Sequence, residues 1–326
     1  MPELTRKTKL ILAVLLMAFL IVLPIPMQKS SVRICCRIMM YCTLAGSLNV
    51  INGFSGQTCL GQAGFYAIGA YVMSILITRF QISFWILLPI SGICAALVGA
   101  LIALPTLRMK GIYLSMVTLG AAEIIRIIAL NWTSVTGGAF GIKGITRPSF
   151  FGFTFNSPLK FYYLFLTVAV LFLFVTNRIM NSRIGRAWLS IREGELAATS
   201  LGVETARFKV MNFMYGAFWA GVAGGMYAPY LQYIDSNSFT LNEGFTILSM
   251  VILGGQGTLA GPVVGSVVVN LLTEVLRPIA DWRFVIYAVL LLVMIWVRPQ
   301  GILGMESKGI TGGLQPRKAK KKAVVK

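Results

Sequence analysis

The stretch LILAVLLMAFLIVL, residues 10–23, contains no charged residue and decides the class of the fold. A second stretch of this kind, FVIYAVLLLVMIWV, occupies residues 284–297. Runs of about 20 apolar residues are long enough to cross a bilayer as helices. The composition agrees, because 57% of the 326 residues are hydrophobic and only 12% are charged, whereas a soluble domain is about 25% charged. The sequence therefore predicts an all-α polytopic membrane protein.

The net charge of +19 does not indicate nucleic-acid binding. The basic residues gather at the ends of apolar runs and in the C-terminal tail PRKAKKKAVVK (316–326), without interleaved aromatic side chains or a nucleic-acid fold signature. This distribution is typical of a membrane protein whose cytoplasmic face is rich in Lys and Arg. We expect the tail to be attracted to anionic lipid.

The chain carries no recognisable catalytic or cofactor motif. It contains no histidine, and its five cysteines lack metal-ligand spacing, so we expect buried thiols and no metal site. There is no G-x-x-x-x-G-K-[ST] phosphate loop and no H-E-x-x-H metal motif. GQGTLA (255–260) formally matches a dinucleotide fingerprint, but between two apolar runs it predicts a tight turn. We therefore expect a protein that is not an enzyme and binds no cofactor.

The apolar windows predict about ten membrane-spanning helices. They lie near residues 10–27, 36–53, 60–78, 83–106, 112–130, 160–177, 209–230, 241–255, 260–277 and 283–298. The run 241–277 is divided at LGGQGTLAGP (253–262), because Gly-rich sequence that ends in proline interrupts helices. Small residues repeat every four positions in 216–228, which predicts close packing of helix backbones.

Charge sets the expected orientation. With the N-terminus inside, the count places Arg108, Lys110, the segment 178–208 and the tail in the cytoplasm, as the positive-inside rule requires. The one exception is a predicted outer loop with Lys29, Arg33 and Arg37, so either the first two spans are misjudged or this loop breaks the rule. The longest outer segment is 131–159, and a loop of that length is more often functional or disordered than idle.

Two places within the spans carry polar groups that are costly in lipid. NVINGFSGQTCLGQAGFYAIGAY (49–71) combines five glycines with amide side chains, and irregular backbone at membrane depth must be buried in protein or line a wet cavity. The alternative is a short cytoplasmic loop between ordinary spans. In addition, Glu123 and Arg126 stand one helical turn apart and can pair, as structural glue or as part of a transport path. The candidate path residues are Asn52, Gln57, Gln62 and Glu123.

The segment 178–209 is the charged exception in the second half of the chain. Ile184, Ala187, Trp188 and Ile191 share one helical face, Gly194 interrupts the helix, and Gly202 suits the end of a second short helix. The segment is either an interfacial connector or a docking element for a soluble partner. As a docking element, its charged flank would fix the register of the partner by complementary charges.

Several motifs then point to one family. ELAATSLG (195–202) resembles the EAA loop of ABC importer permeases, although Glu195 stands one residue early. GFSGQTCLGQAGFYAIGAY (53–71), GIYLSMVTLGAAEIIRIIALNW (111–132) with TGG (136–138), SRIGRAWLSIREGELAATSLG (182–202) and RPQGILG (298–304) resemble, in order, the LivM-type permeases of branched-chain amino acid (LIV/HAAT family) ABC importers. The resemblance covers about residues 36 to 304.

The resemblance implies a permease subunit in a prokaryotic inner membrane that carries branched-chain amino acids. It implies a second, related permease, two ABC ATPase subunits on the inner face that hydrolyse the ATP, and an external solute-binding protein. The binding protein would contact the outer loop 131–159. The ATPase contact would be the segment 192–202, with the candidate coupling residues Arg192, Glu193, Glu195, Ala197, Ala198 and Gly202.

The expected organisation is a transmembrane permease domain, 1–304, followed by a basic cytoplasmic tail, 305–326. Within the domain, 182–208 would be the cytoplasmic coupling segment. Permeases of this type for urea, short amides or other amino acids are alternatives, and a stand-alone secondary transporter is a further one. The scarcity of membrane carboxylates argues mildly against proton coupling in such a transporter.

Overall fold

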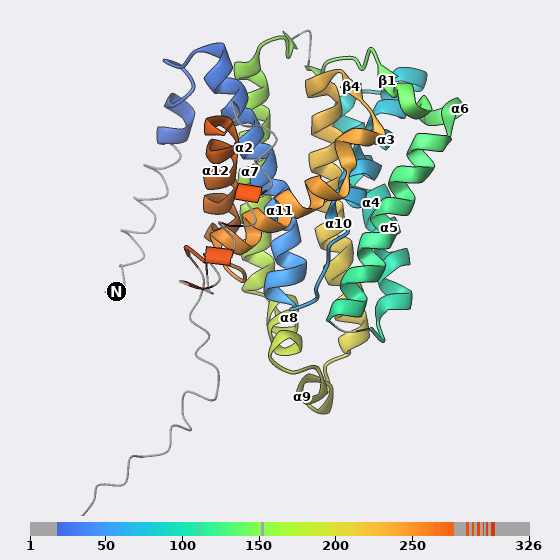
Figure 1. The fold of residues 1–326 in the computed structure, drawn as a ribbon, viewed down its shortest axis with the longest axis vertical. Helices are drawn as coiled ribbons and strands as arrows, with labels where there is room; N and C mark the ends of the chain where they lie inside the picture. The colour runs from blue at the N-terminus through green and yellow to red at the C-terminus, as the bar shows by residue number, and fades with distance from the viewer. Residues whose placement is uncertain are drawn as a thin grey trace, which may run out of the picture.

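The computed structural model describes residues 18–109, 111–150, 153–276, 285, 286, 289, 292, 293, 296, 298 and 301–303. It is a bundle of long helices that run roughly side by side (Figure 1). The long helices are α2 (Lys29–Asn49), α3 (Gln62–Phe80), α4 (Phe84–Thr106), α5 (Ile112–Asn131), α7 (Pro158–Met180) and α10 (Thr205–Leu231). The shorter ones are α6 (Thr133–Thr136), α8 (Arg183–Glu193), α9 (Glu195–Ser200), α11 (Leu241–Gly254) and α12 (Ala260–Val275).

Five segments of the described chain are long and apolar enough to cross a membrane. They are Lys29–Phe54, Gln62–Phe80, Phe84–Thr106, Ile112–Asn131 and Pro158–Met180. The 27-residue α10 has the length but is less apolar, whereas α11 and α12, with 14 and 16 residues, rise only about 21 and 24 Å. The expected count of about ten spans is therefore not confirmed. Of the expected end spans, 10–27 is described only from residue 18 and 283–298 only at single positions.

The second predicted span begins earlier than expected. α2 starts at Lys29 rather than near residue 36, so Lys29, Arg33 and Arg37 lie in its first three turns and not in a loop. The predicted span began too late because these charged residues interrupt the apolar run of the sequence but do not interrupt the helix. Lys110, which the orientation rule also used, lies outside the described residues.

α10 packs between α3 and α4 through its small residues. An added Cβ at Gly224 would stand 2.1 Å from the backbone oxygen of Tyr66 in α3, and one at Gly221 would stand 2.7 Å from that of Ser91 in α4. Real Cβ atoms do not approach other atoms so closely, so only glycine permits these contacts. The close packing predicted from the repeat in 216–228 is confirmed.

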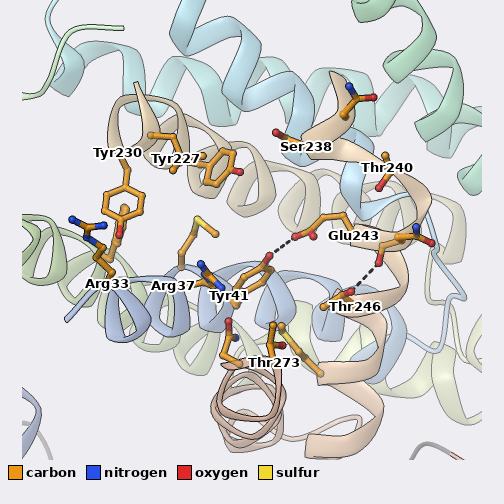
Figure 2. A pocket seen from close by; sticks show the side chains of 17 residues that line it. Arg33, Arg37, Tyr41, Tyr227, Tyr230, Ser238, Thr240, Glu243, Thr246 and Thr273 are labelled. Atoms are coloured by element: carbon orange, nitrogen blue, oxygen red, sulfur yellow. Dashed lines mark hydrogen bonds between the residues drawn. The ribbon is translucent and has the colours of Figure 1, made fainter. Parts of the chain in front are cut away.

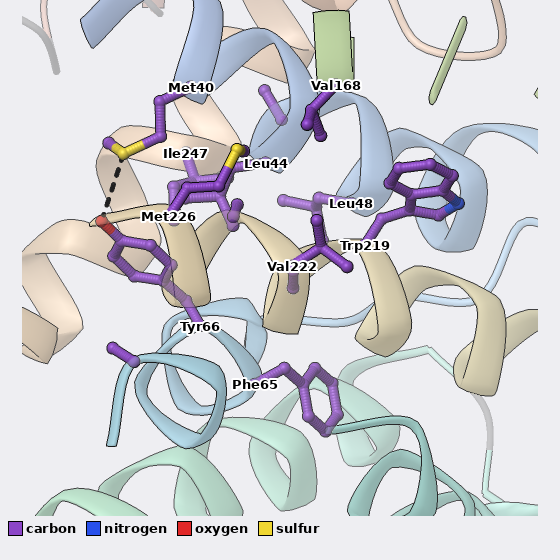
Figure 3. Close-up of a cluster of buried hydrophobic side chains, with 14 of the residues drawn as sticks. Met40, Leu44, Leu48, Phe65, Tyr66, Val168, Trp219, Val222, Met226 and Ile247 are labelled. Carbon is purple, nitrogen blue, oxygen red and sulfur yellow. Dashed lines mark hydrogen bonds between the residues drawn. The ribbon is translucent and has the colours of Figure 1, made fainter. Parts of the chain in front are cut away.

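The core lies where α2, α3, α7, α10 and α11 meet (Figure 3). Leu44 and Leu48 of α2 are fully buried, Leu48 beside Trp219 and Val222 of α10 and Leu44 nearer Met226 and Ile247. The Tyr66 hydroxyl contacts the Met40 sulfur at 3.6 Å. Cys36, Cys42 and Cys59 are buried free thiols, as expected, and Cys35 and Cys94 are partly exposed.

The two ends of the bundle differ. At one end, called here the α9 end, α8 and α9 project from the long helices (Figure 1). The opposite end, called the ribbon end, carries most of the segment 131–159. That segment folds into α6, a 3₁₀ turn η2 (Gly138–Phe140) and three two-residue strands, β1 (Ile142–Lys143), β2 (Ser149–Phe150) and β3 (Phe153–Thr154). β1 pairs antiparallel with β4 (Tyr233–Ile234) after α10, and β2 pairs with β3.

α11 and α12 form a tight helical hairpin, as the division at 253–262 predicted. α11 ends at Gly254, and added Cβ atoms at Gly254 and Gly265 would stand 1.9 Å and 1.8 Å from backbone oxygens of the facing helix. Residues 302 and 303 donate backbone hydrogen bonds of 2.9 Å to Leu253 O and Gly254 O. The end of the RPQGILG motif thereby satisfies carbonyls that the end of α11 leaves open.

Candidate functional site

The chain leaves regular α-helix at the end of α2. A π-helical turn, η1 (Val50–Phe54), is followed by residues 55–61, which form no helix, before α3 begins at Gln62. We call residues 50–61 the α2–α3 break. Asn52 holds it closed on itself, because its side chain donates to Cys59 O at 3.2 Å and accepts from Cys59 N at 2.9 Å. A side-chain amide here takes the place of a backbone partner.

A buried hydrogen-bond network fixes the break to α10. Asn212 of α10 donates to Val50 O at 3.1 Å, and its side-chain oxygen lies 3.0 Å from the Ser55 hydroxyl. Gln57 then donates to that hydroxyl at 2.8 Å. Polar groups that are removed from water must be satisfied in this way, so the break is a built feature of the interior and not a loop in solvent.

Gln62 begins α3 and is 1% exposed. Its amide donates to the Ser47 hydroxyl of α2 at 2.6 Å. Its side-chain oxygen has no hydrogen-bond partner among the described residues. An unsatisfied buried acceptor costs about 1–3 kcal/mol.

The turn between α11 and α12 docks on the same break. Asn49, the last residue of α2, donates to Thr258 O at 2.8 Å and accepts from Gly257 N at 2.9 Å. An added Cβ at Gly53 would stand 2.4 Å from Gly257 N. The sequence GQGTLA is thus a tight turn, as predicted, and its glycines bring two backbones together.

Arg192 joins the charged segment to the break. It is the penultimate residue of α8, and its Nη1 donates to Gly53 O at 2.6 Å across 139 positions of sequence. The side chain of Arg192 lies close to the backbone of two glycines. A Cβ added to Gly56 would stand 3.2 Å from Arg192 Cγ, and a Cβ added to Gly257 would stand 2.3 Å from Arg192 Nη1. A guanidinium on a carbonyl is among the stronger hydrogen bonds. α8, the break and the α11–α12 turn therefore meet at one side chain.

The predicted helix, interruption and short helix are present as α8, Gly194 and α9. Trp188 of α8 is buried and donates to Phe208 O at 3.0 Å, so the apolar face of α8 packs on the bundle itself. Gly202 follows α9 with φ +83°, the left-handed conformation that favours glycine at a helix end. Glu195 begins α9 and forms an ion pair with the largely buried Lys209 of α10.

α9 turns one face to the bundle and the other to solvent. Ala198 is 2% exposed and lies on the face of α9 that packs against the bundle. Leu196 and Leu201 are 80% and 83% exposed, and Glu193 and Ala197 are also exposed. Two leucines standing in solvent at a helix tip are typical of a contact with a partner. Both leucines belong to the motif ELAATSLG, but the resemblance to the EAA loop rests on its alanines and glycine, so the leucines were not predicted as contact residues.

Glu123 lies apart from the other candidate path residues. It is on α5, the least buried of the candidate spans, and accepts from Arg126 Nε at 2.9 Å. The side chains of Glu123 and Arg126 remain 28% and 21% exposed. The pairing predicted from the one-turn spacing is confirmed. Asn52 and Gln57 thus lie in the α2–α3 break and Gln62 directly follows it, whereas Glu123 lies on α5.

A cavity of about 710 Å³ occupies the half of the bundle nearer the ribbon end. α2, α7, α10, η3 (Ser236–Phe239), α11 and α12 line it. Figure 2 shows Arg33, Arg37 and Tyr41 projecting from α2. Glu243 of α11 reaches Tyr41, whereas Arg33 lies at the other side of the cavity, beside Tyr230. The Tyr41 hydroxyl donates a hydrogen bond to the Glu243 carboxylate. The cavity thus holds cationic and anionic groups together.

Sequence reasoning missed the residues of this cavity, although one signal was present. Arg33 and Arg37 broke the expected charge asymmetry, and both prove to face the cavity. Asn49, Lys209 and Asn212 were also missed as site residues. Asn49 and Asn212 bond across 209 and 162 positions of sequence, and Lys209 pairs with Glu195 on another helix, so no pattern within one helix marks them.

Comparison with known proteins gives a consistent set of relatives. The family described as "Branched-chain amino acid transport system / permease component" matches residues 30–297. The high-affinity branched-chain amino acid transport system permease protein LivM of Escherichia coli K12 is 37% identical over 325 residues, which cover 92% of this chain and 76% of LivM.

Two further relatives are more distant. The probable LivM of Methanocaldococcus jannaschii is 25% identical over 66% of each chain. The permease protein LivH of Salmonella typhimurium is 24% identical over 81% of this chain and 91% of LivH. No solved structure matches the chain.

Proposed function

The chain belongs to the branched-chain amino acid transport system permease family, and from that premise we propose how its described parts move a substrate. It is a multi-pass protein of the inner membrane and a permease subunit of an ABC importer. Its substrates are branched-chain amino acids, a reading that the family favours over urea, amides or a stand-alone secondary transporter.

The proposed assembly contains further subunits. Both LivM and LivH relatives are permease proteins of one named transport system, which supports pairing of this chain with a second, related permease. Two ABC ATPase subunits would supply the energy. A solute-binding protein would deliver the amino acid at the ribbon end, where 131–159 presents exposed Trp132 and Phe140. The tail 305–326, which lies outside the described residues, would contact anionic lipid.

The α9 end is the proposed ATPase contact. All six candidate coupling residues lie on α8, on α9 or just after it, and among them Ala198 packs α9 against the bundle. The observation that carries this proposal is the hydrogen bond from Arg192 to Gly53 O. Through that contact a displacement of α8 and α9 reaches the α2–α3 break directly. The ion pair between Glu195 and Lys209 would transmit the displacement of α9 to α10.

The proposed mechanism is alternating access without covalent chemistry in this chain. The break is the inner closure of the path, with Asn52, Gln57 and Gln62 as its polar residues. Discontinuous helices near the substrate path are a recurrent device of transporters. ATP-driven closure of the ATPase dimer would move α9, release the contact at Gly53 and rearrange the break. The tight glycine contacts of α10 with α3 and α4 let these helices move as one body.

Arg192→Gln tests this mechanism. The importer complex, purified through a tag on this chain and reconstituted with its binding protein, should import labelled leucine only with ATP. Loss of the charge-assisted hydrogen bond, worth about 1.5–3 kcal/mol, should lower import about tenfold while ATP hydrolysis persists. Arg183→Gln at the start of α8 is the control. Equal import by wild type and Arg192→Gln would contradict the coupling route, and import without an ATPase would contradict the function.

Glu123 stays a predicted path residue, and its pairing with Arg126 allows a test. Glu123→Gln leaves an unpaired guanidinium within a span, so the yield of folded complex should fall severalfold. The double variant Glu123→Gln, Arg126→Gln removes both charges and should restore the yield, as measured by size-exclusion chromatography. If the double variant also imports leucine at the wild-type rate, the pair is structural glue and Glu123 is not a path residue.

A further inference from the structure

We propose that the cavity at the ribbon end is the substrate site of this permease. In it, Arg33 and Arg37 bind the α-carboxylate of the amino acid and Glu243 binds the α-ammonium group. The inference rests on the proposed function and adds the residues that recognise the zwitterion. It starts from charge, because these three residues are ionisable groups that α2 and α11 carry into one cavity of a membrane protein.

The positions of the charges suit an amino-acid head group. Arg33 and Arg37 stand one helical turn apart on α2, so their side chains reach the same region. Glu243 comes from the facing helix (Figure 2). Guanidinium groups bind carboxylates through two parallel hydrogen bonds. A ligand with both signs of charge can therefore lie between α2 and α11 with each charge opposite its complement.

Glu243 is held in place for this role. It lies in the first turn of α11, where the helix dipole favours a negative charge. The Tyr41 hydroxyl donates to one of its carboxylate oxygens. A carboxylate can accept several hydrogen bonds, so the bond from Tyr41 does not by itself exclude an ammonium group as a further donor to Glu243.

The remaining wall suits a branched aliphatic side chain. Met40, Phe165, Leu231 and Met250 line the cavity together with Tyr227. A ligand site typically combines such an apolar wall with a few placed polar groups and has a volume of about 300–1,000 Å³. At about 710 Å³ the cavity has room for an amino acid and water. The apolar wall selects the side chain, whereas the charges select the head group.

The cavity does not extend along α2 as far as the α2–α3 break. Tyr41 lines the cavity and Asn49 bonds the α11–α12 turn. They are eight residues apart on α2, about 12 Å along the helix. Between them, Leu44 and Leu48 are fully buried in the core (Figure 3). The lining of the cavity thus stops short of the α2–α3 break.

The competing explanation is structural. Arg33 and Arg37 would reach lipid headgroups, and Glu243 would only stabilise the start of α11. The two explanations differ in what the charges do for import. A structural role predicts loss of protein, whereas substrate binding predicts intact complex that no longer imports.

The experiment measures ATP-dependent import of labelled leucine by the reconstituted importer with its binding protein. Arg37→Gln and Glu243→Gln should each lower import at least tenfold, with complex yield and basal ATP hydrolysis within twofold of wild type. Lys160→Gln is the matched control, because Lys160 lies at the same end but outside the cavity and donates to Thr154 O. Import by Arg37→Gln and Glu243→Gln at the control level would overturn the inference.

Glu243→Asp separates the two roles if Glu243→Gln reduces the yield. Aspartate keeps a negative charge in the first turn of α11 but withdraws the carboxylate by one methylene. If Glu243→Asp gives a normal yield of complex but leucine import is still reduced at least tenfold, Glu243 contacts the substrate. If this variant restores both the yield and the import, the inference is overturned. Failure of the wild-type complex to import leucine would instead contradict the proposed function.

Discussion

Replacing Leu196 and Leu201 together with glutamate should separate this permease from its ATPase. Both side chains stand in solvent at the α9 end, 80% and 83% exposed, so neither supports the fold of the chain. Burying a leucine contributes about 1.5–3 kcal/mol. Loss of two such contacts should weaken association at least about 100-fold, since each 1.4 kcal/mol is a factor of ten.

The measurement is co-purification of the ATPase through a tag on the permease, followed by ATP-dependent leucine uptake. We expect the double glutamate variant to elute as a folded membrane protein, to lose the ATPase and to show no uptake above background. The double methionine variant is the matched control, because methionine keeps an apolar side chain of similar size at both positions. Normal recovery of the ATPase with the glutamate variant would show that α9 is not the docking element.

The α8–α9 segment was largely predictable because its signals are local. Gly202 follows α9 with φ +83°, a conformation that favours glycine, Gly194 separates α8 from α9, and the apolar face of α8 follows from helical spacing. What the sequence did not reveal is which side of α9 faces out. Ala198 is buried under α9 while its neighbour Ala197 is exposed, and six residues are too few for a pattern to orient a helix.

The break was one of two alternatives for the stretch 49–71, but its contacts and the cavity could not be predicted, for a different reason. Their contacts join positions far apart in the chain, such as Arg192 with Gly53 and Asn212 with Val50. Such pairs depend on how the helices pack, which composition does not specify. The start of α2 was misplaced for the same reason: Arg33 and Arg37 are tolerated in a span because a cavity formed by other helices receives them.

The glycines of α10 allow the second prediction of large effect. Gly224→Ala adds one Cβ, which would stand 2.1 Å from Tyr66 O and 2.7 Å from Ala70 N. Both atoms belong to the backbone of α3, so no side chain can rotate away. α3 and α10 must separate, and the buried contacts between them are weakened along their length. Overpacking usually costs about 1–3 kcal/mol, and a clash between two backbones should exceed that.

Gly120→Ala is the matched control for this prediction. Gly120 also lies within a long helix, α5, but an added Cβ there meets nothing within 4 Å. The same substitution should stabilise α5 by up to about 1 kcal/mol, since alanine is the better helix former. Thermal unfolding of the detergent-purified chain, followed by size-exclusion chromatography, should show a lower melting temperature for Gly224→Ala and an equal or higher one for Gly120→Ala. If both variants melt with the wild type, α3 and α10 do not pack backbone to backbone, and their proposed movement as one body in transport loses its basis.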